Sequence, residues 1–314
     1  MTPTARASLV CSAMILAFAA PLYDHLGLSF AWETLAPHLV LLGLLFGIWS
    51  HRQMVPDRRQ NAVVNDLMLA IFLLLVLTNV SSPAQYVAVA LKRPLIDHWL
   101  AAADAALGIH VPSLVAWTRA HPTADLLLTV CYYSLLPQFV LAPVAAALVL
   151  KDPDRLWEYV FHFHFCLIVT LATLAIFPAA HAFTYYGFES TLNQTRLIHH
   201  FQTLRDGSFT TIRFDDLEGL ISMPSFHAAG AMMVTWMFRG HRRWFVPVAL
   251  LNVGLVASTV MTGAHYFIDV VATGAIFLTS LIVFRLYGPR LTPRASSRSD
   301  FDWRVKDDAD ERSR

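Results

Sequence analysis

Long apolar runs are the feature of this sequence that most limits its possible folds. A helix needs about 20 mostly apolar residues to cross a bilayer, and eight stretches approach or exceed that length. They are residues 7–27, 34–50, 64–80, 124–150, 157–180, 224–239, 244–262 and 265–287. Of the 314 residues, 56% are hydrophobic and only 14% are charged, a composition too apolar for a soluble domain. The sequence therefore predicts an all-α, polytopic membrane bundle of about eight spans.

The apolar runs divide the chain into three parts. Residues 1–63 hold two N-terminal spans, and the first could instead be a signal peptide, because Arg6 precedes it and Ala17-Phe18-Ala19 resembles a cleavage site. Residues 64–288 form the main membrane domain, in which Pro137 and Pro143 are expected to kink the span 124–150. Residues 289–314 are polar and mixed in charge, which predicts a disordered tail.

Basic residues gather in alternate segments between the spans. Because Lys and Arg are enriched in cytoplasmic loops, these segments, the tail and both termini are predicted to be cytoplasmic. Segments 81–123 and 181–223 then lie on the extracytoplasmic face, periplasmic or lumenal, and the plasma membrane is the expected location. The basic residues that set this orientation are Arg52, Arg58, Arg59, Lys151, Arg155, Arg239, Arg242, Arg243, Arg285, Arg290, Arg294 and Arg298.

Charge and cysteine usage exclude several other classes of protein. The net charge of +1 comes without a basic stripe interleaved with aromatic residues, so no nucleic-acid partner is expected. The three cysteines all lie in apolar runs and no two are closely spaced, which argues against a disulfide framework or a thiolate metal site. No metal and no cofactor is predicted.

A histidine and a carboxylate stand together at the start of the last span. His265 and Asp269 are four residues apart, which places both on one face of a helix. A carboxylate beside an imidazole fixes its tautomer and raises its basicity, as a nucleophile or a base requires. The alternative is a polar pair that orients the helix at the membrane interface.

Two further polar groups fall on the same predicted side of the membrane. Pro224-Ser225-Phe226-His227 has the form of a helix start, whose free N–H groups bind phosphate well. Lys92-Arg93 follows the third span, where its cations could clamp phosphate oxygens. The alternatives are a capped helix with an interfacial histidine, and basic side chains that anchor at the lipid headgroups.

These three segments resemble the motifs K-x6-RP, PSGH and SR-x5-H-x3-D of the type-2 phosphatidic acid phosphatase superfamily, in the same order and on the same predicted side. The resemblance covers roughly residues 83–287 and leaves the first two spans outside. It implies a six-helix phosphatase-like core. The matching segments are Arg93-Pro94, Pro224-Ser225-Phe226-His227 and His265-Tyr266-Phe267-Ile268-Asp269.

The chain departs from these motifs at three positions. Tyr86 stands where the first motif has lysine, with Lys92 the only nearby substitute, and Phe226 replaces the glycine of the second. In the third, Ser258 is in place but Thr259 replaces the arginine. These departures are more similar to the branch of inositolphosphotransferases and inositol phosphorylceramide synthases than to lipid phosphatases. The lost arginine leaves one phosphate contact open, and Arg196, Arg205 and Arg213 in segment 181–223 are candidates for it.

The resemblance implies a role for each matching residue. His265 would attack phosphorus and form a phosphohistidine, and Asp269 would orient it. His227 would protonate the leaving oxygen and later deprotonate the acceptor.

The phosphoryl oxygens would then be held by Arg93, Lys92 and Ser225, without a metal. The substrate would be a lipid phosphate in the membrane. Water as acceptor would make the protein a phosphatase, and an alcohol such as inositol would make it a transferase, which the branch resemblance slightly favours.

The alternatives are a lipid-binding protein without turnover and a transporter, although ionisable residues near the bilayer midplane, typical of coupled transporters, are not evident.

A short amphipathic stretch follows Lys92-Arg93. Ile96, Leu100, Ala103 and Leu107 recur at helical spacing, which predicts an interfacial helix lying on the bilayer. Asp97 and Asp104 share its other face, and the expectation for both is a solvated surface.

Overall fold

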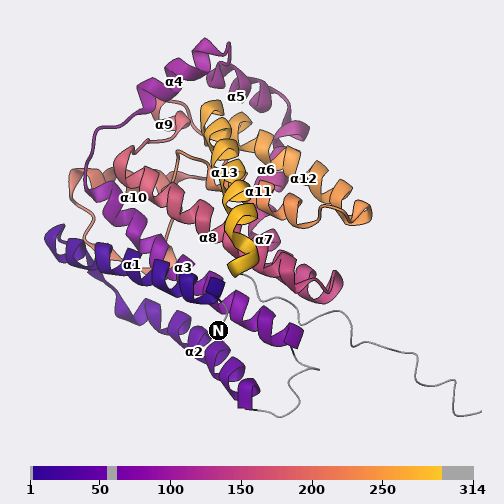
Figure 1. Ribbon diagram of the computed structural model, residues 1–314. Helices are drawn as coiled ribbons and strands as arrows, with labels where there is room; N and C mark the ends of the chain where they lie inside the picture. Colours follow the sequence, from indigo (N-terminus) through magenta and orange to yellow (C-terminus); the bar gives the residue numbers. More distant parts are fainter. Residues whose placement is uncertain (1–2, 55–61, 292–314) are drawn as a thin grey trace, which may run out of the picture.

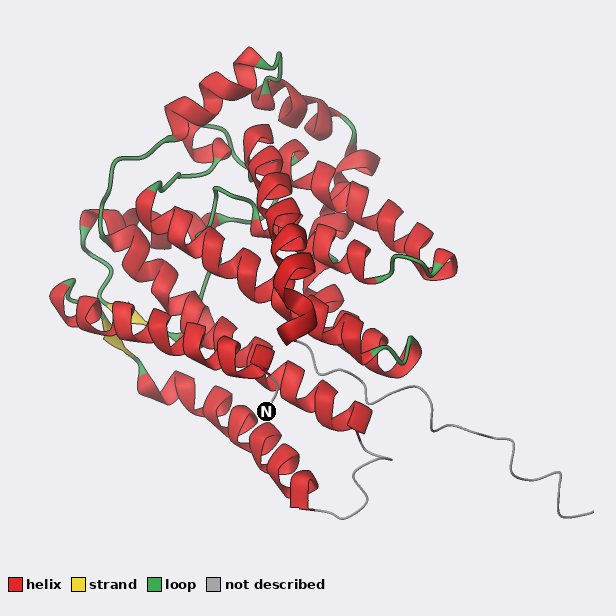
Figure 2. Cartoon of the chain, viewed as in Figure 1, coloured by secondary structure: helices red, strands yellow, loops and turns green. Residues whose placement is uncertain are grey.

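The computed structural model describes residues 3–54 and 62–291, and these are almost entirely helical (Figures 1 and 2). The all-α membrane bundle expected from the apolar runs is confirmed. The α-helices are α1 (Pro3–His25), α2 (Trp32–Met54), α3 (Ala62–Ala90), α4 (Asp97–Ala106), α5 (Val111–Ala120), α6 (Pro122–Tyr133), α7 (Leu135–Val144), α8 (Pro153–Ile176), α9 (Ala182–Tyr186), α10 (Thr195–Asp206), α11 (Phe226–Met237), α12 (Arg242–Met261) and α13 (Phe267–Leu291).

Six of the described helices are long and apolar enough to cross a membrane on their own: α1, α2, α3, α8, α12 and α13. Two bent pairs raise the number of candidate spans to eight, namely α4 with α5, bent by 79°, and α6 with α7 and the π-helical turn Ala145–Val149, bent by 41°. In lipid a helix satisfies all of its backbone hydrogen bonds internally, which is why such apolar runs adopt this form.

The sixth expected span, residues 224–239, is short already by sequence, and its helix is two residues shorter at each end. Its helix α11 has 12 residues, or about 18 Å at 1.5 Å per residue, against a hydrocarbon core of about 30 Å. The chain leaves the helix at Phe238 and turns through Gly240, whose φ is +80°. By length, α11 therefore spans only part of the bilayer. It ends beside the start of α8, where Arg155 donates to the carbonyls of Met237 and Arg239 at 2.7 and 2.6 Å.

The kink expected in the fourth span is present, and proline explains its position. Pro137 has no backbone N–H, and its ring would clash with the carbonyl four residues earlier, which is that of Tyr133. Helix α6 ends at Tyr133, and α7 begins at Leu135. The π-helical turn follows Pro143 in the same way.

Helix α8 is the centre of the bundle. It packs against α3, α11 and α13, and α11 in turn contacts α7, α12 and α13. The N-terminal pair α1 and α2 lies on the far side of α3 (Figure 1). Helix α2 leaves almost its whole apolar surface exposed, including Leu44 and Phe46, as expected of a helix that faces lipid.

The segments between the spans form a layer over one end of the bundle. Helices α4 and α5 lie above the start of α13 at the top of Figure 1, α9 lies below α4, and α10 packs against α3. The only sheet in the described residues joins this layer to the N-terminal pair: β1 (Ser29–Phe30) pairs in parallel with β2 (Thr211–Ile212), shown in yellow in Figure 2.

The predicted tail overlaps the end of α13, which continues to Leu291. Residues 292–314 lie outside the described residues, as do Arg58 and Arg59 of the first predicted cytoplasmic loop.

Candidate active site

His227 lies in the first turn of α11, and two contacts fix its position. Ser225 is the N-cap of the helix, and its Oγ accepts a hydrogen bond from Ala228 N at 3.3 Å. Such a cap satisfies one of the free N–H groups of a helix start. The imidazole of His227 stacks on the ring of Tyr132, with centroids 4.3 Å apart. The helix start expected from the sequence is therefore confirmed.

His265 lies in the loop between α12 and α13, beside the first turn of α13. Its backbone N–H donates to the carbonyl of Thr259 at 2.9 Å. Its Nδ1 is 3.4 Å from Oδ2 of Asp269, and the same oxygen accepts the N–H of Tyr266 at 3.0 Å. Both side chains are fully buried. The carboxylate therefore lies beside Nδ1 of the imidazole at ion-pair distance, without the geometry of a hydrogen bond.

The two histidines meet across the start of α11. Their ring centroids are 6.3 Å apart, although His227 lies in α11 and His265 in the loop before α13. Both side chains line one cavity of about 400 Å³. That separation allows one small group between the rings to hydrogen-bond to both of them at the usual distance of about 2.8 Å.

The cavity is lined mainly by apolar side chains, and its polar lining comes from the histidines, from Gln194 and from α3 side chains such as Ser81 and Gln85. Its walls come mainly from α3, α7 and α8, with Leu74, Phe139 and Leu167 among the apolar side chains. Phe226 adds to this wall and packs edge-on against Phe163. A phenylalanine where the related motif has glycine therefore extends the apolar surface of the site.

A second cavity of about 330 Å³ adjoins the first. The two share Tyr132, His227 and Gln194 among their lining residues, and Asn193 and Glu218 of the outer layer complete the second. His227 therefore lines both chambers, whereas His265 lines only the first.

A third imidazole, which the sequence did not single out, lines the same cavity. His181 follows α8 at the start of α9, and its ring centroid is 6.1 Å from that of His265. Burial lowers the pKa of His181 to about 3 and that of His265 to about 4. Both lie in loops between the helices, and both are neutral at pH 7. The only signal in the sequence is a histidine directly after an apolar span, on the face where the motif histidines lie.

The expectation of a solvated surface at Asp97 and Asp104 is wrong, because both side chains are buried. Asp104 accepts the N–H groups of Phe267 and Ile268 at 2.9 and 2.8 Å, and so caps α13 from another helix. Asp97 accepts the N–H of Ala180 at 2.9 Å through Oδ2. Their partners come from distant segments, which the helical pattern of α4 alone does not reveal.

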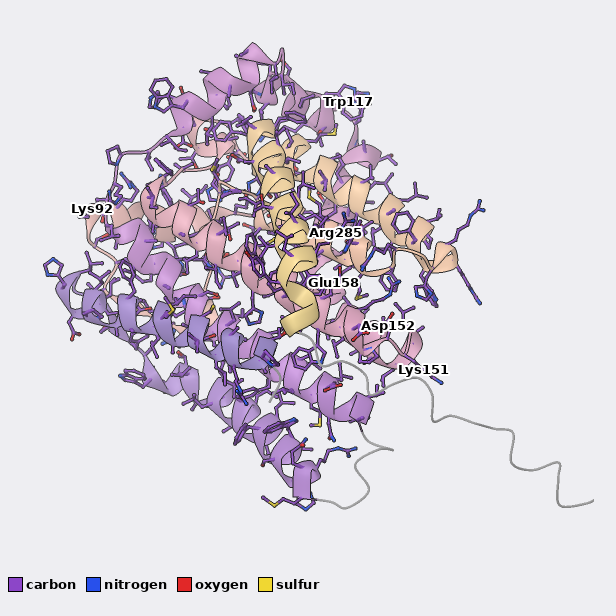
Figure 3. The ribbon with its side chains drawn as sticks, in the orientation of Figure 1. Lys92, Trp117, Lys151, Asp152, Glu158 and Arg285 are labelled. Carbon is purple, nitrogen blue, oxygen red and sulfur yellow. The ribbon has the colours of Figure 1, made fainter. Side chains whose placement is uncertain are left out.

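Lys92 and Arg93 lie apart from the histidines. Both are exposed, neither lines the cavity, and Figure 3 shows Lys92 at the edge of the molecule. Helix α3 continues to Ala90, ten residues beyond the expected end of the third span at 80, and so carries the pair past the cavity. The carbonyl of Arg93 accepts a hydrogen bond from Arg205. Phosphate binding by Lys92 and Arg93 stays a prediction.

The remaining motif positions have structural partners. Tyr86, at the place of the motif lysine, is buried, and its hydroxyl accepts the N–H of Glu218 at 2.9 Å. Thr259, at the place of the motif arginine, is buried and donates to the carbonyl of Val256 at 2.7 Å. Neither side chain lines the cavity.

The arginines considered as substitutes are also occupied elsewhere. Arg196 pairs with Asp216 and Glu218, and Arg213 pairs with Asp215. No Lys or Arg in the described part of the chain lines either cavity. Across those same residues, no cluster of three or more His, Cys, Asp or Glu side chains has the arrangement of a metal site.

Comparison with known proteins agrees with this geometry. A family model described as the PAP2 superfamily matches residues 98–283, which contain all three cavity histidines and Asp269 but not Lys92 or Arg93. No curated protein and no solved structure matches the chain. Members of this superfamily are generally phosphatases and phosphotransferases. The match extends over more than half of the chain, and the protein therefore belongs to the PAP2 superfamily.

Proposed function

We propose that this protein transfers the phosphoryl group, or the phosphate-linked headgroup, of a membrane lipid through a phosphohistidine at His265. The observation that carries the proposal is the placement of two imidazoles 6.3 Å apart in a mainly apolar cavity, with a carboxylate 3.4 Å from one of them. Family membership supports a phosphatase or phosphotransferase at the coarser level.

In the first step, the free ring nitrogen of His265 attacks phosphorus. A P–N bond forms, the P–O bond to the leaving group breaks, and His227, which enters the step as the imidazolium, donates its proton to the departing oxygen. Asp269 keeps the attacking tautomer in place and stabilises the positive charge that develops on the imidazole. Burial keeps His265 unprotonated at neutral pH, as attack requires.

In the second step, an acceptor hydroxyl attacks the phosphohistidine. His227, now neutral, takes the proton of the acceptor, the new P–O bond forms, and the P–N bond breaks. General acid–base catalysis of this kind contributes about 10²–10⁴-fold. The stacking of Tyr132 on His227 keeps that ring facing His265 through both steps.

The shape of the cavity supports a lipid as the substrate. Its apolar walls between α3 and α7 suit hydrocarbon, and its histidines suit a phosphate. The adjoining chamber near Asn193 and Glu218 offers polar groups for an alcohol acceptor. We favour transfer to a polyol such as inositol over hydrolysis, on the basis of the motif departures at Phe226 and Thr259.

Turnover by purified protein tests this proposal. Labelled lipid phosphates, lipid diphosphates and phosphoinositol lipids are supplied in detergent or vesicles, with and without free inositol. A labelled inositol product or an inositol-dependent rate supports transfer, and release of inorganic phosphate alone supports a phosphatase. Binding without turnover of any substrate would leave the lipid-binding alternative.

The role of His227 can be separated from that of His265 by the leaving group. An activated aryl phosphate has a leaving group that needs no proton. It should recover part of the rate in His227→Ala, and none in His265→Ala. Equal rescue of both variants would contradict the assignment of acid and nucleophile.

We further propose that the site faces the extracytoplasmic side of the plasma membrane. The basis is the bias of Lys and Arg towards segments at the opposite end of the bundle, where Lys151 lies (Figure 3). An impermeant thiol reagent on intact cells should modify an engineered cysteine at exposed Arg119 but not one at Lys151, in a background without native cysteines. The reverse pattern would overturn the orientation.

A further inference from the structure

We propose that His181 is a third phosphate-binding side chain of this site, which donates a hydrogen bond to the phosphoryl oxygens where the related motif uses arginine. This inference rests on the proposed function for its ligand. It concerns a residue outside all three motifs. Four observations on the described residues carry it.

The first is position. The ring of His181 lies 6.1 Å from that of His265, nearly the same separation as between His265 and His227, and all three line the cavity. Phe183 stacks on His181 at 5.5 Å between centroids. An imidazole at this spacing reaches the oxygens of a phosphoryl group on His265 within hydrogen-bonding distance.

The second is an unused polar atom. Nδ1 of His181 is buried without a hydrogen-bond partner, and the side chain is 2% exposed. A buried polar group without a partner costs more than a hydrogen bond returns, so such groups call for an explanation. An imidazole carries at least one N–H donor, and two when it is protonated. A phosphoryl oxygen in the cavity supplies the missing acceptor.

The third is backbone conformation. His181 has φ of +73° and ψ of 149°, close to a region that glycine alone occupies readily. Residues held there concentrate at functional sites, and the surrounding structure must enforce the conformation. Two hydrogen bonds hold the segment before His181 in place. Asp97 accepts the N–H of the preceding residue, Ala180, and Ile96 N donates to the carbonyl of Pro178 at 3.0 Å.

The fourth is the absence of a permanently charged donor from the described lining of the cavity. Thr259 occupies the arginine position and is bonded to its own helix, and no Lys or Arg among the described residues lines the cavity. A phosphoryl group entering the cavity therefore meets only imidazoles as groups able to become cationic. His227 and His265 already have roles in proton and phosphoryl transfer, which leaves His181 to hold the oxygens.

The test compares His181→Gly and His181→Asn with wild-type protein, using orthovanadate as the probe. Glycine adopts the backbone conformation without strain, and asparagine tolerates positive φ and retains a donor. Vanadate binding is measured as stabilisation against thermal unfolding, which grows with ligand concentration over Kd. His98→Ala, which removes an exposed histidine of α4, is the matched control.

We expect His181→Gly to unfold at a temperature close to that of wild type but to bind vanadate about 10–100-fold more weakly, as for loss of a hydrogen bond to a charged group. His181→Asn should fall between the two, and free imidazole should restore vanadate binding to His181→Gly. If His181 only supported the fold, free imidazole would not restore vanadate binding.

Wild-type vanadate affinity in His181→Gly would overturn the proposal, and so would a wild-type protein that binds no vanadate. Wild-type protein that binds vanadate but turns over no lipid phosphate would contradict the proposed function alone. In that case the binding of vanadate to the variants would still show whether His181 binds the phosphoryl oxygens.

Discussion

The carboxylate of Asp97 accepts the hydroxyl hydrogen of Tyr266 at 2.9 Å, across 169 positions of sequence. The same carboxylate binds Ala180 N, so one buried side chain of α4 holds the residues next to both His265 and His181. Asp104, two turns further along α4, caps the start of α13. Helix α4 therefore fixes the positions of two of the three cavity histidines without touching the cavity itself.

Tyr266→Phe tests this bracing by removing one hydroxyl. The change removes one hydrogen bond to Asp97 Oδ1, which still accepts from Ala180 N at 3.0 Å. A hydrogen bond to a charged group is worth about 1.5–3 kcal/mol. We expect a lower unfolding temperature and a reduced kcat, because the segment that carries His265 is less firmly held. Tyr185→Phe, at an exposed tyrosine nearby, is the control. Identical thermal stability and kcat in the two variants would show that the Asp97 contact is dispensable.

Protonation of buried histidines should make the fold sensitive to acid. The pKa of His265 falls from its ordinary value of 6.5 to about 4 because burial disfavours its charged form. Between these values the unfolded chain binds more protons than the folded chain, so the free energy of unfolding falls as the pH falls from about 6.5 to 4. The contribution of neutral, buried His265 to the free energy of unfolding is therefore fully present above pH 6.5.

Thermal unfolding of wild type and His265→Gln across pH 4–7.5 measures this linkage. The variant should show a shallower decline in unfolding temperature on the acid side, whereas the exposed-histidine variant His98→Ala should follow wild type. Parallel curves for His265→Gln and wild type would mean that His265 titrates alike in the folded and unfolded chains.

Close packing at Gly230 should make the cavity wall intolerant of a larger residue. A Cβ at Gly230 would come within 2.6 Å of Phe139 and 2.7 Å of Leu135, and Phe139 lines the cavity. We expect Gly230→Ala to lose about 1–3 kcal/mol of stability, as overpacked cores do, and to change KM. At Gly47 in α2 nothing lies within 4 Å of such an atom. Gly47→Ala should therefore leave stability unchanged or raise it.

Arg93 is the residue for which the sequence motif and the structure lead to different expectations. A direct hydrogen bond to phosphate is worth about 1.5–3 kcal/mol, so its loss would lower kcat/KM roughly 10–150-fold. The side chain lies on the exposed loop after α3, outside the cavity. We therefore expect Arg93→Ala to retain kcat/KM within about threefold of wild type, well short of one such bond. A loss of 100-fold would support the motif assignment instead.

Much of the fold could be predicted from the sequence, because length and apolarity alone define a membrane span. The kink after Tyr133 follows from Pro137 by local sterics. The short α11 follows largely from the sequence, because Arg239 ends its apolar run two residues after the helix itself ends at Met237. The helix packs against α8, α12 and α13, so its apolar side chains contact protein instead of lipid.

The site was predictable where it depends on local spacing. The spacing of His265 and Asp269 predicted their contact at 3.4 Å, although not on one helical face, because α13 begins only at Phe267 and His265 lies in the loop before it. Ser225 caps the helix that carries His227. The contributions of His181 and Asp97 depend on contacts between segments far apart in the chain, so nothing in their neighbouring residues indicates them. The position of Arg93 depends on how far α3 continues, and an apolar run does not define its own end to within a few residues.

Trapping the covalent intermediate tests the central claim most directly. Protein incubated with a lipid phosphate labelled at phosphorus is quenched in base, where phosphohistidine survives, and is mapped by peptide mass spectrometry. We predict an acid-labile phosphate, or phosphate-linked headgroup, on His265 alone. It should be absent from His265→Ala and accumulate in His227→Ala when the leaving group is activated. Label on another side chain, or full turnover by His265→Ala, would contradict the account.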